Sequence, residues 1–298
     1  MKTKATLFTL LTFMGLSTLH AQVKIGDNHT TIDASVALEI ESSSKGFLPP
    51  RLTTAQRNAI ASPAEGLTVY NTEVNCLQWF NGTGWYNVCD GSVAIPTVFG
   101  ANGVEWMDRN LGASQVATSS TDADSYGDLY QWGRAADGHE KRTSPTHDGT
   151  TNRPSTITET GAWDGKFITI PSSTNRNDWV TTQTDDAWNT GTAGAPIKTA
   201  TDPCPSGFRL PTQAEWQAEI NAGNWSNATD PFSSPLKLPL AGYRGRSSGS
   251  PNFVGSDGFY WSSTEIGHLS HIFLFGAQSP QTISYNRAFG LSVRCIKD

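Results

Sequence analysis

Short apolar runs separated by turn residues make up most of this chain. Before about Asp90, the proline-containing segment 46–51 must be extended, because proline excludes helix there. From Val98 onward the pattern predicts many short strands and turns. The segment from Ile266 to Ile296 predicts β-strands with a turn near residues 279–280. The polar and apolar pattern therefore predicts a strand-rich chain with few helices.

Two positions carry the signature of a helix start. Thr53 and Gln56, and later Thr212 and Glu215, have the spacing of a capping box, in which each side chain satisfies an unpaired amide of the first turn. The first helix should be short because a Ser-Pro pair follows it closely. The second should end near Gly223.

An aromatic-rich hairpin is expected between Cys76 and Cys89. A two-residue turn would leave the cysteines out of register, whereas a four-residue loop over 81–84 sets Cys76 opposite Cys89. That register also pairs Phe80 with Trp85, a favourable cross-strand contact. We therefore predict the longer loop and a Cys76–Cys89 disulfide.

The other two cysteines are expected to pair with each other. Four cysteines in an exported chain indicate two disulfides with three possible connectivities, and the hairpin leaves Cys204 with Cys295. This bridge would tie the middle of the chain to its end. Zinc is the competing interpretation, but the chain has no Cys-x-x-Cys and no histidine beside these cysteines.

The N-terminus and the composition indicate export. Residues 1–21 carry a basic start, an apolar run and a small residue at the end, which predicts a cleaved signal peptide. The 298-residue chain has a net charge of −6 and no basic cluster, which argues against nucleic-acid binding. No later segment is apolar enough to span a membrane. We expect a secreted or outer-surface protein.

The chain divides into two expected domains after the signal peptide. Residues 22–95 form a small β-rich module, which can bury little surface alone and needs its disulfide or self-association for stability. Segment 91–97 consists mostly of small residues with one proline and shows no hydrophobic periodicity, which predicts a linker. Residues 96–298 form the second domain. The fold class is therefore α+β, with a small β-rich module before an irregular domain.

A polar tract over residues 137–202 holds the first candidate binding residues. A structureless loop of this length is unusual in a compact domain, so we expect an ordered excursion with short strands. Trp163, Trp179 and Trp188 lie in it among Asp and Asn. Such tryptophans suit sugar stacking, but tryptophans that pin a long loop would look the same.

Other candidate chemistry is weak. Arg244 and Arg246, in a Gly/Ser-rich turn, could reach an acidic ligand, although a solvated loop explains them too. His268 and His271 are three residues apart, but in a strand that spacing directs them to opposite faces. Segment 122–128 resembles a calcium loop but lacks the required glutamate, so an ordinary turn is favoured. We expect no metal, no cofactor and no catalytic residue.

Six segments of the second domain form an ordered series within about residues 98–298. They are VEWMDRNL (104–111), YGDLYQW (126–132), CPSGFRLPT (204–212), LAGYR (240–244), YWSSTE (260–265) and SVRCIKD (292–298). This series resembles the Fibrobacter succinogenes major paralogous domain, a family that occurs in secreted and surface proteins of Bacteroidetes and their relatives.

Two further resemblances suggest architecture. The run RLPTQAEW (209–216) is similar to formylglycine-generating enzymes, and implies a C-type-lectin-like fold held by buried tryptophans and disulfides. The run KGFLPPR (45–51) resembles a leader found on Bacteroidetes surface proteins and phage tail-fibre-like proteins. It implies an attachment or oligomerisation module.

Three functional hypotheses follow. The first is a non-catalytic surface protein that binds a polysaccharide or another surface ligand through loops of the second domain. The second is a structural subunit of an extracellular fibre or filament, a homo-oligomer assembled through residues 22–95. The third is an enzyme on the formylglycine-generating fold, which requires Cys204 or Cys295 to be a free thiol.

Overall fold

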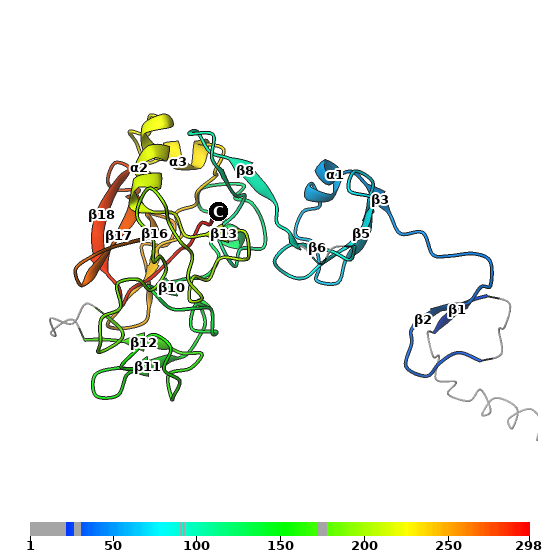
Figure 1. Ribbon diagram of the computed structural model, residues 1–298, viewed down its shortest axis with the longest axis horizontal. Helices are drawn as coiled ribbons and strands as arrows, with labels where there is room; N and C mark the ends of the chain where they lie inside the picture. Colours follow the sequence, from blue (N-terminus) through cyan, green and yellow to red (C-terminus); the bar gives the residue numbers. More distant parts are fainter. Residues whose placement is uncertain (1–21, 27–30, 90, 92, 172–177) are drawn as a thin grey trace, which may run out of the picture. The chain divides into compact units, whose positions relative to one another are not determined.

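Strands in several small sheets account for most of the regular structure, and few short helices accompany them (Figure 1). Contacts divide the chain into two compact units, residues 1–51 and residues 52–298. This boundary lies earlier than the expected one near residue 95. The computed structural model describes residues 22–26, 31–89, 91, 93–171 and 178–298, so the expected signal peptide (1–21) lies outside the described residues.

The first unit contains one parallel strand pair. Its strands are three residues long and pair in register, Val23 with Leu38 and Ile25 with Ile40. An extended segment follows and leads to the first strand of the next sheet, as the prolines of 46–51 predict. The two strands are β1 (Val23–Ile25) and β2 (Leu38–Ile40).

A five-stranded sheet of order β3-β4-β5-β6-β7 follows, and it contains the expected hairpin. Phe80 pairs with Trp85, with ring centroids 5.7 Å apart, and Cys76 is bonded to Cys89. The four-residue loop and the disulfide are thus confirmed. The expected linker over 91–97 is wrong in part, because residues 93, 94 and 97 belong to two short strands. The elements are β3 (Arg51–Leu52), α1 (Thr54–Asn58), β4 (Thr68–Asn71), β5 (Cys76–Phe80), β6 (Trp85–Asn87) and β7 (Val93–Ala94). The strand that follows, β8 (Thr97–Phe99), belongs to another sheet.

The remaining strands build four sheets, with orders β10-β19-β14-β15, β13-β20-β9-β8, β16-β17-β18 and β11-β12. Only the three-stranded sheet has long strands, and its turn at 276–280 confirms the expected one. The elements are β9 (Glu105–Met107), η1 (Ala123–Ser125), β10 (Tyr130–Gln131), β11 (Thr146–Asp148), β12 (Phe167–Thr169), β13 (Phe208–Arg209), β14 (Tyr243–Arg244), β15 (Pro251–Asn252), β16 (Gly258–Ile266), β17 (Leu269–Phe275), β18 (Gln281–Asn286), β19 (Gly290–Leu291) and β20 (Ile296–Lys297).

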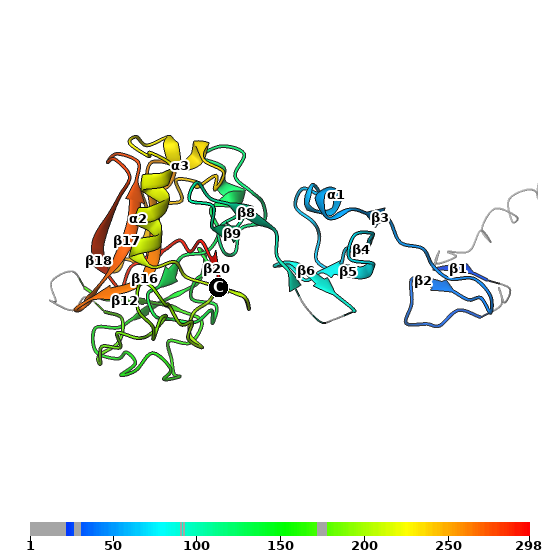
Figure 2. The same ribbon diagram turned by 45° about the horizontal axis from the view of Figure 1, so that its top comes forward.

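The longest helix packs on the three-stranded sheet, beside the short helix α3 (Asp230–Ser233) (Figure 2). It is α2 (Gln213–Ala222), capped by Thr212 and Glu215 and ending at Gly223, which confirms the expectation. Both of the expected capping boxes are complete. Trp216 stacks on Phe273 of β17 at 4.9 Å, so the apolar face of the helix closes one core.

The second disulfide joins Cys204 to Cys295, as expected, and both cysteines are buried in the main core. No cysteine is free. In the described part of the chain, no helix is long and apolar enough to cross a membrane.

Buried arginines hold the irregular parts of the second unit together. Arg287 and Arg294 are almost completely buried and donate mainly to backbone carbonyls of distant loops, and Asn110 receives two further hydrogen bonds from Arg294. Buried carbonyls need hydrogen-bond partners, which regular secondary structure would otherwise supply. These cations thus take the place of longer strands and helices.

Candidate functional site

The three tryptophans of the polar tract lie in the core. Trp179 and Trp188 are 1% exposed, and Trp163 is 7% exposed. Each indole N–H donates to a backbone carbonyl: that of Trp163 to Glu159, that of Trp179 to Trp132 and that of Trp188 to Thr201. A sugar ring needs an open aromatic face to stack on. The burial therefore favours the alternative in which these tryptophans pin the tract.

Arg244 is also buried and holds neighbouring loops together. It is 4% exposed, donates to the backbone of Gly249 and to both the hydroxyl and the carbonyl of Ser144, and lies 4.4 Å over the Phe167 ring. Burial lowers the pKa of its guanidinium. Arg244 therefore does not reach an external ligand as the sequence suggested. Arg246 is half-buried, with its guanidinium 6.0 Å from the Phe289 ring.

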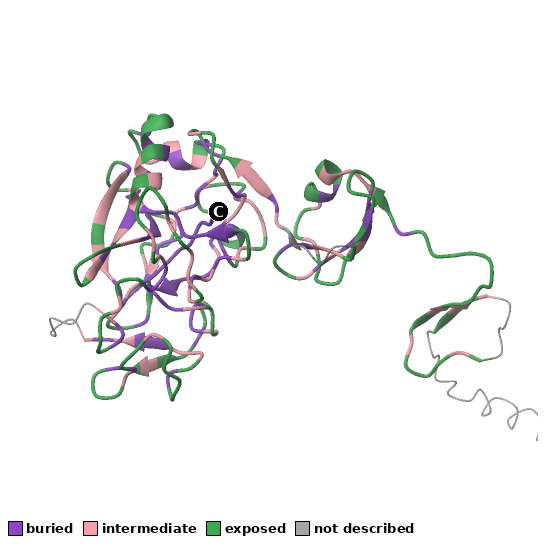
Figure 3. Cartoon of the chain, viewed as in Figure 1, coloured by how far each residue is buried: buried purple, intermediate pink, exposed green. Residues whose placement is uncertain are grey.

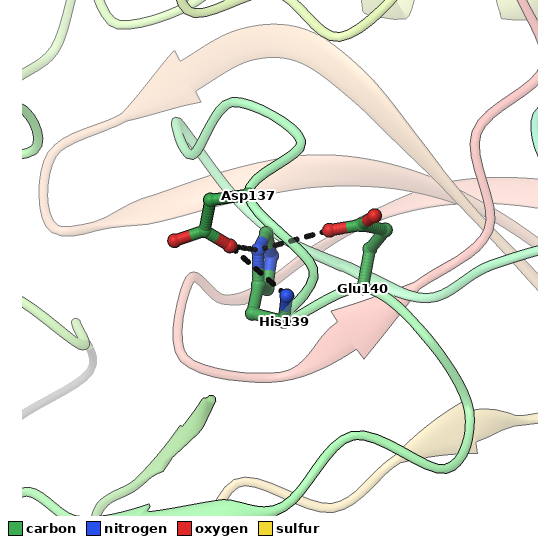
Figure 4. A group of neighbouring side chains, drawn as sticks. All are labelled: Asp137, His139 and Glu140. Atoms are coloured by element: carbon green, nitrogen blue, oxygen red, sulfur yellow. Dashed lines mark hydrogen bonds and ion pairs between the residues drawn. The ribbon is translucent and has the colours of Figure 1, made fainter. Parts of the chain in front are cut away.

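The tract begins with a buried histidine that sequence spacing did not single out (Figure 4). His139 is completely buried, and its Nδ1 lies 2.6 Å from a carboxylate oxygen of Asp137. Its Nε2 accepts the backbone N–H of Gln131 at 3.1 Å. This assigns the neutral tautomer with the proton on Nδ1. Burial lowers the pKa of His139 to about 4.

Asp137, which holds the His139 ring, lies in a more exposed position. Its second oxygen receives two hydrogen bonds from Arg134, at 2.6 and 3.1 Å. Although burial would raise it, the hydrogen bond from His139 and the charge of Arg134 hold the pKa of Asp137 well below its usual value. The carboxylate therefore stays charged and fixes the imidazole.

Asp137, His139 and Glu140 also have the residue types of a metal site. One ligand atom from each lies within 4.8 Å of the others, the only such group in the described residues. However, both nitrogens of His139 already have partners, and Glu140 accepts the Gly138 backbone N–H at 2.9 Å. A metal ion would have to break one of these bonds. The cluster therefore acts as a hydrogen-bonded clamp on the 128–144 segment.

A more open group of aromatic residues lies at the edge of the main core. Tyr243, Phe253, Tyr285 and Phe289, which we call the aromatic patch, form a chain of ring contacts with centroids 4.6 to 6.2 Å apart. Phe253 is 55% exposed, and the other three are half-buried. The guanidinium of Arg246 lies beside the patch.

The backbone at Phe253 is unusual for an exposed residue. Its φ is +55°, in the left-handed region, where a side chain costs roughly 1–2 kcal/mol. Exposed apolar groups in strained positions are typical of contact sites. Sequence reasoning missed the patch because its residues come from three separate segments, and only the fold brings them together.

Comparisons with known proteins give one match. Residues 24–105 match the family model described as a phage tail-like trimerisation region. The match runs from β1 to the first residue of β9, and so includes the whole five-stranded sheet. No curated protein and no solved structure matches the chain. The similarity concerns the N-terminal third only and leaves the second domain unassigned.

Proposed function

We propose that this protein is a homotrimeric extracellular attachment or display protein. Residues 24–105 join three copies of the chain, and each copy carries one irregular C-terminal domain. The single observation that carries this proposal is the match of those residues to a trimerisation region. It develops the oligomeric alternative of the sequence analysis.

The two disulfides support an extracellular location. Such bonds persist in oxidising compartments and are rare in the cytosol. The small sheets, the buried tryptophans and the bridge to the end of the chain support a C-type-lectin-like domain of the resembled family. The enzyme alternative requires a free thiol at Cys204 or Cys295, and these two cysteines are bonded to each other. We retain the interpretation that the protein is not an enzyme.

Analytical ultracentrifugation of the exported chain tests the trimer. We expect a mass of three chains across micromolar concentrations, unchanged by reduction if the contacts between chains are noncovalent. A monomer throughout that range would refute the proposal. A dimer would also refute it, since the matched family is described as trimeric.

Ligand binding by the C-terminal domain is a second candidate function. The aromatic patch favours it, because aromatic faces with adjacent polar groups are typical of ligand sites. The expected ligand is a polysaccharide, whose apolar sugar faces would stack on Phe253 and whose acidic groups would meet Arg246. Three copies on one trimer would raise the avidity of each weak contact.

A glycan panel with a matched pair of variants tests this site. Phe253→Ala should weaken binding by about tenfold, the loss of roughly 1.4 kcal/mol of contact. Ile197→Ala is the control, because Ile197 is also an exposed apolar residue, at 58%, outside both the patch and residues 24–105. Equal losses in the two variants, or no loss in either, would exclude the patch as the site. EDTA should have no effect, as no metal takes part.

A further inference from the structure

In the β1–β2 pair the apolar side chains are exposed, whereas the lysine side chain is mostly buried. This is the reverse of an ordinary protein surface. The ammonium of Lys24 lies 2.8 Å from Glu39 and 2.9 Å from Glu41, and only 9% of its side chain is exposed. Strand alternation places these three charged residues on one face and the apolar residues on the other. The apolar residues Val23, Ile25, Leu38 and Ile40 are 42% to 56% exposed.

The described residues of the first unit form no core to which this face could belong. Among the described residues from 22 to 51, none of the valine, isoleucine, leucine or phenylalanine side chains is buried (Figure 3). Two strands of three residues are marginal in water unless they pack against something else. We therefore expect the β1–β2 pair to be stable only when another apolar surface packs against its apolar face.

We propose that this apolar face is covered by the same face of two further copies of this chain, around a threefold axis. The inference rests on the proposed function and names the contact surface. The matched trimerisation region begins at Lys24, within β1, so the pair belongs to it.

The charges agree with contact between identical faces. The apolar face carries no ionisable side chain, so three copies meet without like-charge repulsion. On the charged face Lys24 binds both glutamates within one chain, so only one net negative charge per chain remains there, on the side away from the contact. In a closed cyclic trimer the face toward the axis can be fully apolar while the ion pairs remain at the periphery.

A pair of variants of the full exported chain separates this inference from the proposed function. Ile25→Asp/Ile40→Asp places two carboxylates on the face. The control, Ile197→Asp/Ile266→Asp, alters two residues of similar exposure, at 58% and 49%, outside residues 24–105. Native mass spectrometry should show one chain for the first variant and three for both the control and the wild type.

Each other result is decisive. A trimeric Ile25→Asp/Ile40→Asp variant would overturn the surface but leave the trimer standing. A monomeric wild type would remove both. If the first variant does not fold, a bis-maleimide cross-link keeps the test open: Val23→Cys should give covalent dimers, and Ile197→Cys, at a similarly exposed position outside residues 24–105, should not. Equal cross-linking at both positions would overturn the surface.

Discussion

Removal of the Cys204–Cys295 bridge should destabilise the C-terminal domain far more than removal of Cys76–Cys89 destabilises the hairpin. The first bond closes a loop with a sequence separation of 91 and the second one of 13. Loop-closure entropy then gives about 4.6 kcal/mol for the long loop and about 3 kcal/mol for the short one. Cys204→Ala/Cys295→Ala and Cys76→Ala/Cys89→Ala are the matched pair of variants.

Hydrogen exchange with peptide resolution measures this difference without assuming that the whole chain unfolds in one step. In Cys204→Ala/Cys295→Ala, amides of β16 and β17 should exchange roughly a thousandfold faster, which corresponds to the same entropy. The β5–β6 hairpin should be unchanged there, and should exchange roughly a hundredfold faster in the other variant. Less than a tenfold change in β16–β17 would refute the entropic reasoning. Equal changes in both regions would show that the hairpin and the domain unfold together.

Three further predictions concern the interior. His139 has a pKa of about 4 in the folded chain and about 6.5 in the unfolded chain. Its contribution to the free energy of unfolding is therefore complete above pH 6.5 and is lost as the pH falls toward 4. His139→Gln should therefore remove about 3 kcal/mol of pH dependence over that window in urea unfolding, and an unchanged slope would contradict the assignment. Trp188→Phe should cost about 2 kcal/mol, because it deletes the hydrogen bond to Thr201, yet leave glycan binding intact. Reduced glycan binding at unchanged stability would instead restore the sugar-stacking interpretation. Arg287→Met should cost about 3–5 kcal/mol in the same assay, because it strands buried carbonyls and carboxylates, whereas a loss below 1 kcal/mol would show that water replaces it.

Local signals in the sequence predicted the local structure well. Both capping boxes work through residues three apart, so their geometry is set before any tertiary contact forms. The hairpin register follows from loop length and cysteine spacing, and it came out as expected. The pairing of Cys204 with Cys295 followed by elimination.

The candidate site was harder to predict because it depends on contacts between distant segments. Tryptophans among polar residues looked exposed, but the tract folds back and buries them with their N–H groups on carbonyls. Arg244 seemed solvated because its neighbours are Gly and Ser, yet its partner Ser144 lies 100 residues away. Composition near a residue does not report such long-range partners.

The buried arginines Arg287 and Arg294 have a consequence for how the sequence of this domain can vary. Arg287 and Arg294 hold Thr184, Gly267 and Leu236 through main-chain oxygens, which every amino acid possesses. These hydrogen bonds therefore place no demand on the side chain, although Leu236 is fixed by its burial in the core and Gly267 by its positive φ of 56°. Loops on such a frame can accept new sequences, by natural drift or by library randomisation, while the path of the chain is retained. The same frame could thus be re-targeted to a different surface without redesign of its interior.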